Sequence, residues 1–154
     1  MKPDKAILIE LVAEKDVPAL YDLLQASGLP ADGLDEHLST TLVARDDTGV
    51  VGSAALELYG KSALLRSVVV AQPIRGTGLG RKLVEAAQAT ASRAGVQRLY
   101  LLTETGAEWF PRFGFTPTAR ADVDPAVQHS IEFTSACPDS AQAMKKDLMV
   151  LGES

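Results

Sequence analysis

Three glycines stand close together in the stretch Arg75-Gly76-Thr77-Gly78-Leu79-Gly80. The stretch follows an apolar run, residues 64–71, and precedes a segment with helical spacing of its apolar residues, 81–94. A strand that turns through glycines into a helix leaves backbone N–H groups free, with the positive end of the helix dipole behind them. Glycine also adopts backbone angles that other residues resist and lets a ligand approach the main chain. The sequence therefore predicts a site for a phosphorylated ligand.

Two common phosphate-binding motifs do not fit this spacing. A Walker A loop needs a hydroxyl residue after Gly-Lys, but Gly80 is followed by Arg81-Lys82-Leu83, which offers no hydroxyl to hold magnesium. The dinucleotide fingerprint needs G-x-G-x-x-G, whereas the glycines here run G-x-G-x-G. What remains is Arg-x-x-Gly-x-Gly, with an ordinary glycine turn that binds nothing as the alternative.

The composition limits the class of protein. Apolar residues make up 46% and charged residues 23% of 154 residues, an ordinary globular balance, and no run approaches the roughly 18 apolar residues of a membrane helix. We therefore expect one domain over residues 1–154, cytoplasmic and not bound to a membrane. The formal net charge of −5 argues against a nucleic-acid surface. One cysteine and two histidines make a metal site unexpected.

Hydrophobic periodicity and turn residues predict alternating strands and helices. Strands are expected at 6–12, 41–45, 50–59, 62–71 and 98–103, and helices at 16–28, 32–38, 81–95, 106–112 and 124–133. Strands 41–45 and 50–59 should form a hairpin, and strand 98–103 should run parallel to 62–71 because a helix crosses between them. Residues 144–150 alternate like a strand, although propensity alone favours a helix over 140–148.

The order of strand, glycine loop, helix, strand and short aromatic helix resembles the GNAT family of N-acetyltransferases. The supporting residues are Leu65-Arg66-Ser67-Val68-Val69-Val70 before the loop and Trp109-Phe110-Pro111-Arg112-Phe113-Gly114-Phe115 after it. The resemblance covers most of the chain. It implies an α/β (α+β) fold with a mixed, mostly antiparallel sheet of about seven strands, a central parallel pair that splays, and flanking helices. It also favours residues 144–150 as the last strand.

The resemblance implies acetyl-CoA as co-substrate, with no metal. In such proteins the pantetheine arm pairs with the strand before the loop, and the loop amides hold the pyrophosphate. The N–H of Val68 would lie near the thioester carbonyl, where negative charge develops. The residues implied for cofactor binding are Val68, Val69, Val70, Arg75, Gly76, Thr77, Gly78, Leu79, Gly80, Arg81 and Phe110.

Acetyl transfer to an amine requires removal of a proton from the ammonium form and return of one to the leaving thiolate. The family's usual proton donor is a tyrosine where this chain has Phe110, and its usual acidic residue falls at Leu64. The remaining candidates are Glu57 and Glu104 as bases and Tyr59, Tyr100 or water as donors. Glu57 should form an ion pair with Arg66 if the turn centres on Lys61-Ser62, and a purely structural salt bridge is the alternative.

Arg66 is a cation among apolar neighbours and needs an anionic partner. It is expected to share a strand face with Leu64, Val68 and Val70. Leu65-Arg66-Ser67-Val68 is similar to the stretch in acetyltransferases of glutamate and related amino acids, where the arginine binds the substrate carboxylate. The implied acceptor is a primary amine on a small carboxylated molecule. The candidate substrate-binding residues are His37, Arg66, Ser67 and Thr103.

A wider set of short motifs resembles acetyltransferases associated with arsenic resistance, whose relatives acetylate amino-acid-like herbicides or arsenicals. The motifs include Gly28-Leu29-Pro30, Glu36-His37, Leu101-Leu102-Thr103-Glu104-Thr105 and Cys137-Pro138-Asp139-Ser140. Cys137 is expected to be a buried structural cysteine, because one thiol is a poor arsenite site. A CoA-binding sensor with little turnover is the rival function. The oligomeric state is open, a homodimer being one option.

Overall fold

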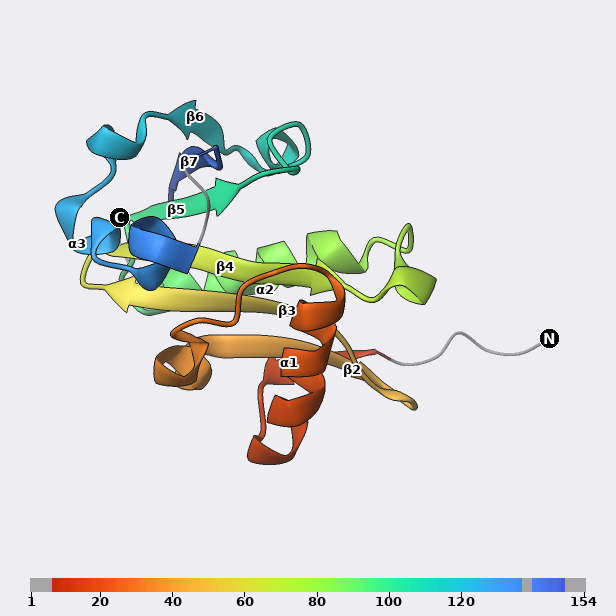
Figure 1. Ribbon diagram of the computed structural model, residues 1–154. Helices are drawn as coiled ribbons and strands as arrows, with labels where there is room; N and C mark the ends of the chain where they lie inside the picture. The colour runs from red at the N-terminus through yellow and green to blue at the C-terminus, as the bar shows by residue number, and fades with distance from the viewer. Residues whose placement is uncertain (1–6, 137–139, 149–154) are drawn as a thin grey trace. The chain divides into compact units, whose positions relative to one another are not determined.

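The computed structural model describes residues 7–136 and 140–148. Its strands form one seven-stranded sheet in the order β1-β2-β3-β4-β5-β7-β6. The strands are β1 (Leu8–Leu11), β2 (Thr41–Asp46), β3 (Gly49–Tyr59), β4 (Ser62–Val70), β5 (Arg98–Thr103), β6 (Thr116–Thr118) and β7 (Gln142–Asp147). The helices are α1 (Val17–Ala26), α2 (Leu79–Arg93) and α3 (Pro125–Gln128). Figure 1 shows their course along the chain.

The sheet is mixed, as the sequence predicts. β4 and β5 run parallel, because α2 connects them, while the ladders β1–β2, β2–β3, β5–β7 and β6–β7 are antiparallel. The predicted hairpin of residues 41–45 and 50–59 is confirmed by the β2–β3 ladder. The turn before β4 lies one residue earlier than expected, at Gly60 and Lys61.

The described residues fall into two compact units. One runs through Ala55 and takes in Ser67–Ala87, and the other takes in Leu56–Arg66 and the residues from Gln88 onward. We refer to them as unit 1 and unit 2. The division into two units does not test the expectation of a single domain, which stays a prediction.

The core of unit 1 lies between α1 and the strands. Apolar residues four positions apart place Leu20 and Leu24 on one face of α1, and both are fully buried. Figure 1 shows α1 on the near side of β2 and β3 and α2 on the far side. The buried members of this core are Leu20, Leu24, Leu34, Val43, Ala55 and Val69.

Unit 2 has a separate core around the parallel pair. Leu64 of β4 and Tyr100 of β5 pack with Val123, Val127 and Ala143. The segment between β6 and β7 covers this cluster through Val123 and Val127, each buried. In this core, a residue that precedes the glycine loop therefore packs against residues from the last part of the chain.

Three helix predictions need correction. The helix expected over 124–133 ends at Gln128, and a π-helical turn, Glu132–Ala136, follows. The helix expected over 106–112 is a 3₁₀ turn, Phe110–Phe113, and that expected over 32–38 is a 3₁₀ segment, Leu34–Thr40. Pro111 lies inside the helix expected over 106–112 and limits it, whereas Pro125 occupies the first turn of α3, where proline is tolerated.

The choice between strand and helix near the end of the chain is decided in favour of a strand. β7 lies between β5 and β6 and is paired with both, so its backbone groups are used by ladders on two sides. This agrees with the strand expected from the resemblance, although β7 begins at Gln142 rather than 144. Residues 149–150 and Cys137, for which a buried role is expected, lie outside the described residues.

Candidate functional site

The glycine loop has the backbone geometry that its sequence predicts at two positions. Gly76 and Gly78 both have φ of +87°, in the left-handed region that glycine occupies without a Cβ penalty. A Cβ built at either position meets no atom of the described residues within 4 Å. Open space therefore lies in front of the main chain here, as close approach by a ligand requires.

Gly80 does not follow the same reasoning. It lies inside α2, which begins at Leu79, and it has no positive φ. The expectation that all three glycines need special backbone angles is therefore wrong for Gly80. Leu79 is buried, whereas Arg81 is exposed on the first turn of the helix.

Two side chains of the loop donate hydrogen bonds to nearby main-chain carbonyl groups. The exposed Arg75 donates from Nε to the carbonyl of Val70 at 3.0 Å, and Thr77 Oγ1 donates to the carbonyl of Ile74 at 2.7 Å. These bonds hold the start and the middle of the turn. The arrangement leaves the amides that follow Gly76 at the N-terminal end of α2.

The parallel ladder of β4 and β5 covers the first residues of β4. Within the described residues the β4–β5 ladder pairs Ser62, Ala63 and Leu64 with residues 98–100, although β4 continues to Val70 and β5 to Thr103. The polar backbone edge of β4 after Leu64 is thus outside that ladder. Such an edge can pair with an extended ligand.

β4 is irregular where the ladder ends. Ser67 has φ of 57° and is the one non-glycine residue with positive φ among those described. Regular alternation is interrupted there, which is why the expected common face of Arg66, Val68 and Val70 does not follow. Val69 is buried in the core of unit 1, while Val68 and Val70 are half-buried.

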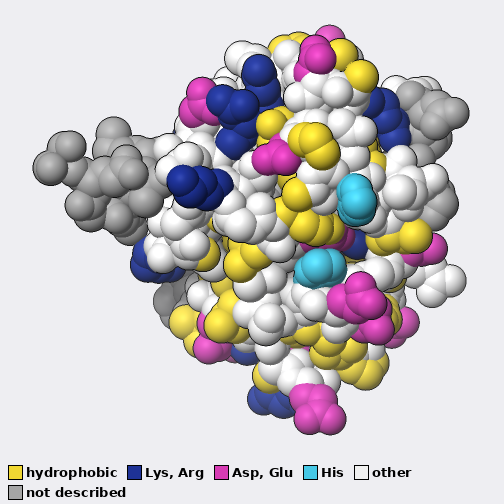
Figure 2. All heavy atoms as spheres, turned by 90° about the vertical axis from the view of Figure 1, so that its left-hand side faces the viewer, with side chains coloured by type: hydrophobic (Ala, Val, Ile, Leu, Met, Phe, Trp, Pro, Cys, Tyr) yellow, Lys and Arg dark blue, Asp and Glu magenta, His cyan; other side chains and the backbone are white. Residues whose placement is uncertain are grey.

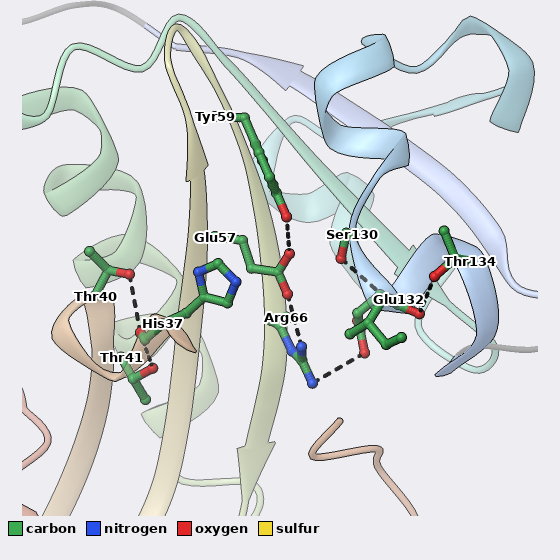
Figure 3. Close-up of polar contacts among 10 residues, drawn as sticks. His37, Thr40, Thr41, Glu57, Tyr59, Arg66, Ser130, Glu132 and Thr134 are labelled. Atoms are coloured by element: carbon green, nitrogen blue, oxygen red, sulfur yellow. Dashed lines mark hydrogen bonds and ion pairs between the residues drawn. The ribbon is translucent and has the colours of Figure 1, made fainter. Parts of the chain in front are cut away.

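A buried polar cluster occupies unit 2 (Figure 3). Arg66 Nη1 lies 2.8 Å from Glu57 Oε2, and Arg66 Nη2 lies 3.5 Å from Glu132 Oε2. The exposed fractions of these side chains are 0% for Arg66, 1% for Glu57 and 6% for Glu132. Tyr59 donates its hydroxyl to the other oxygen of Glu57. The predicted ion pair of Glu57 and Arg66 is confirmed.

Burial and hydrogen bonds within the cluster shift the pKa values of Glu57 and Tyr59. Burial acts to raise the pKa of Glu57, but hydrogen bonds from Tyr59, Arg66 and Ser130, with the charge of Arg66, together lower that pKa below its ordinary value. Burial, and then the hydrogen bond to Glu57, raise the pKa of Tyr59. The cluster at neutral pH therefore holds an ionised carboxylate and a protonated phenol.

The other predicted residues lie as follows. Thr103 Oγ1 accepts a hydrogen bond from the N–H of Gly106 at 2.7 Å, and Glu104 is exposed just beyond β5.

Phe110 is buried, and its ring centroid lies 4.9 Å from that of Trp109 and 5.8 Å from that of Phe115 in edge-on contacts. Phe110 therefore packs edge-on against two aromatic rings at the position where the resemblance places a tyrosine.

The two histidines both reach the surface (Figure 2). His37 is half-buried, and its main-chain carbonyl accepts hydrogen bonds from Thr40 and Thr41. His129 is exposed. Among the residues that the structure describes, no group of three or more His, Cys, Asp or Glu side chains is arranged to hold a metal ion. In the same residues no helix has the length and apolar run needed to cross a membrane.

Sequence reasoning gave no role to the buried residues Ser53 and Ser130, and it named Glu132 only as part of a segment that could close over the substrate. Ser130 contributes to the electrostatics of Glu57, and Glu132 is the second carboxylate of Arg66. Ser53 donates to the carbonyl of Ser67 at 2.6 Å. A polar residue within the apolar run of residues 50–56 was the one available signal, for Ser53.

The sheet order, the parallel pair of β4 and β5 and the glycine loop together define an acetyltransferase fold of the GNAT type. Residues 37–117 match the family described as "Acetyltransferase (GNAT) domain", which is more than half of the chain. The chain belongs to this family.

Individual proteins agree with the family assignment. The chain is 32% identical to an amino-acid acetyltransferase of Pasteurella multocida, over 79% of this chain and 30% of that protein. It is 35% identical to an uncharacterised N-acetyltransferase of Chlorobaculum tepidum, over 54% of each. The chain thus spans between about a third and about half of the length of these relatives.

A solved structure shows the same fold. The N-acetylglutamate synthase of Neisseria gonorrhoeae, complexed with coenzyme A and N-acetyl-glutamate, matches with a TM-score of 0.80 and 18% identity. The match covers 96% of this chain and 36% of that one.

Proposed function

We propose that this protein transfers the acetyl group of acetyl-CoA to a primary amine of a small, carboxylated, amino-acid-like molecule. The observation that carries the proposal is the loop between β4 and α2. It lies within the residues that match the family, and two of its glycines have φ of +87° with open space before them. A loop of this kind suits a diphosphate.

The residues present fit acetyl-CoA as co-substrate. In the proposal, amides from Gly76 to Arg81 hold the pyrophosphate, with Arg75 adding positive charge. The pantetheine arm pairs with the main chain of Val68 and Val70, at the part of β4 that lies beyond its ladder with β5. Phe110 lines the thiol end of the arm.

The chemistry is a direct exchange of one bond for another. The amine nitrogen forms a bond to the thioester carbonyl carbon while the carbon–sulfur bond breaks. One proton leaves the nitrogen, and the thiolate of CoA takes up a proton, so the products are an amide and free CoA. The Val68 N–H would stabilise the oxyanion, and Glu57 with Tyr59 would carry protons, with Glu104 as the alternative base.

The acceptor class is inferred from relatives and from charge. Relatives are named amino-acid acetyltransferases, and one structural neighbour holds N-acetyl-glutamate. Arg66 already has two carboxylate partners, of which Glu132 is the more distant at 3.5 Å. A substrate carboxylate would replace that weaker contact, with His37, Ser67 and Thr103 as further acceptor-binding residues.

The wider biological setting is also a proposal. The motifs that resemble arsenic-resistance acetyltransferases support an amino-acid-like herbicide or arsenical as acceptor. A cytoplasmic location and a homodimer are the corresponding expectations for a metabolic enzyme of this family.

The direct test combines calorimetry with a thiol-release assay. Purified protein should bind acetyl-CoA and release free CoA with at least one member of a panel of amino acids, phosphinic amino acids and amino-acid-like arsenicals. Binding without thiol release on the whole panel would favour the CoA sensor, for which Phe110 and Leu64 at the usual donor and acid positions are the motivating residues. Absence of binding would overturn both functions.

A further inference from the structure

The strained residue of β4 has a specific support on β3. Ser67 holds a φ of 57°, a conformation that costs a residue with a Cβ free energy and persists where surrounding structure imposes it. Ser53 Oγ donates to the carbonyl oxygen of Ser67 at 2.6 Å. Both residues are buried, Ser53 completely. The bond is therefore shielded from competition by water.

The hydrogen bond from Ser53 fixes the orientation of the Ser67–Val68 peptide, whose N–H takes part in the proposed reaction. The carbonyl of Ser67 and the N–H of Val68 belong to one peptide unit, which is planar. The described chain has no cis peptide bond, so this carbonyl and this N–H point in opposite directions. Because the carbonyl is held toward Ser53 on β3, the Val68 N–H is turned away from β3.

The neighbouring backbone keeps the two strands in close contact. Ala71 N–H donates to the carbonyl of Val51 at 2.8 Å. A Cβ at Gly52 would lie 3.0 Å from the carbonyl oxygen of Val69 and 2.9 Å from Leu83 Cδ1. A larger residue at position 52 would therefore push β3 away from the irregular part of β4.

We infer that Ser53 is a positioning residue, which holds the Ser67–Val68 peptide so that its N–H meets the thioester oxygen of acetyl-CoA. The direction of the N–H follows from the hydrogen bond of Ser53 alone. The identity of the group that it meets rests on the proposed function. A merely structural role for Ser53 would contribute to stability without affecting catalysis.

The test compares Ser53→Ala with Ser62→Ala. Ser62 is a matched control, because it is buried and its Oγ also donates a bond of 2.6 Å, to Asp124 Oδ2. Both variants should lose similar thermal stability. Ser53→Ala alone should shift the amide resonance of Val68 and speed its hydrogen exchange.

Kinetics then separate positioning from stability. We expect Ser53→Ala to lower kcat about tenfold to a hundredfold, since a preorganised oxyanion donor is displaced, with the KM for acetyl-CoA changed by less than about threefold. Ser62→Ala should keep the wild-type kcat.

Two results would overturn the inference. One is an unchanged Val68 amide in Ser53→Ala, and the other is an equal effect of the two single variants on kcat. If wild-type protein fails to bind acetyl-CoA, the proposed function fails, while the amide resonance still reports whether Ser53 orients the peptide.

Discussion

The Arg66 guanidinium donates from Nη1 to Oε2 of Glu57 at 2.8 Å, and both side chains are closed off from solvent. Because Arg66 Nη2 also lies 3.5 Å from Glu132 Oε2, the cluster contains two carboxylates for one guanidinium. Burial of such a set is tolerated only while its members stay paired. This relationship leads to three of the predictions below.

Removal of the central cation should be costly. Arg66→Met leaves two buried carboxylates without their cation, and we expect a loss of roughly 3–5 kcal/mol in the free energy of unfolding. Urea denaturation would measure it.

The exposed pair of Arg98 and Asp147 provides the control. Their N–O distance is 2.7 Å, but their side chains are 47% and 75% exposed. Arg98→Met should therefore cost no more than about 1 kcal/mol. Equal losses in the two variants would mean that Arg66 is not held as a buried ion.

The stability contributed by Glu57 should depend on pH. Its pKa in the folded protein lies below the ordinary value of 4.5, so the folded state favours the ionised form. The contribution is therefore complete above pH 4.5 and is lost as the pH falls through the folded pKa. Wild-type protein and Glu57→Gln should differ most in stability near neutral pH and converge in acid.

Denaturant titrations of the two proteins from about pH 3 to about pH 7 would measure this convergence. A difference that stays constant over the range would contradict the lowered pKa.

Tyr59→Phe tests the proton-carrying role of the cluster. The variant removes the hydroxyl that donates to Glu57, so the pKa of Glu57 should rise toward its ordinary value. We expect a fall in kcat of about tenfold or more, with the acid limb of the pH–rate profile moved to higher pH.

Tyr21→Phe is the matched control, since Tyr21 packs against the core of unit 1, whereas the contacts described for the cluster lie in unit 2. The pH–rate profile of this variant should equal that of the wild type. The same profile in Tyr59→Phe would limit Tyr59 and Glu57 to a structural role.

Gly78→Val should abolish acetyl-CoA binding. The added side chain would occupy the open space before the loop, and its β-branch is strained at φ of +87°. Gly28→Val carries a comparable strain, since Gly28 has φ of +71° and equally open space, but it follows α1 rather than the loop. Calorimetry should show near wild-type affinity for Gly28→Val. Unchanged affinity in Gly78→Val would refute the loop assignment.

Local signals in the sequence determined the glycine loop, the hairpin of β2 and β3, and the parallel β4–β5 pair. Turn residues and hydrophobic spacing act over short stretches of chain, and a helix crossing between two strands of one sheet makes them parallel. The ion pair of Glu57 and Arg66 was expected because a short turn connects their strands, and it is present although the turn lies one residue earlier than the register assumed.

Only the tertiary structure decided the remainder. Glu132 and Ser130 join Glu57 and Arg66 across more than sixty residues of chain, a distance over which no local pattern acts. The strand at Gln142–Asp147 overrides helix propensity because β5 and β6 bind it on both sides. The positive φ of Ser67 occurs where the hydroxyl of Ser53 on the adjacent strand binds the Ser67 carbonyl. Such features arise from packing between distant segments, which the spacing of residues along one chain does not encode.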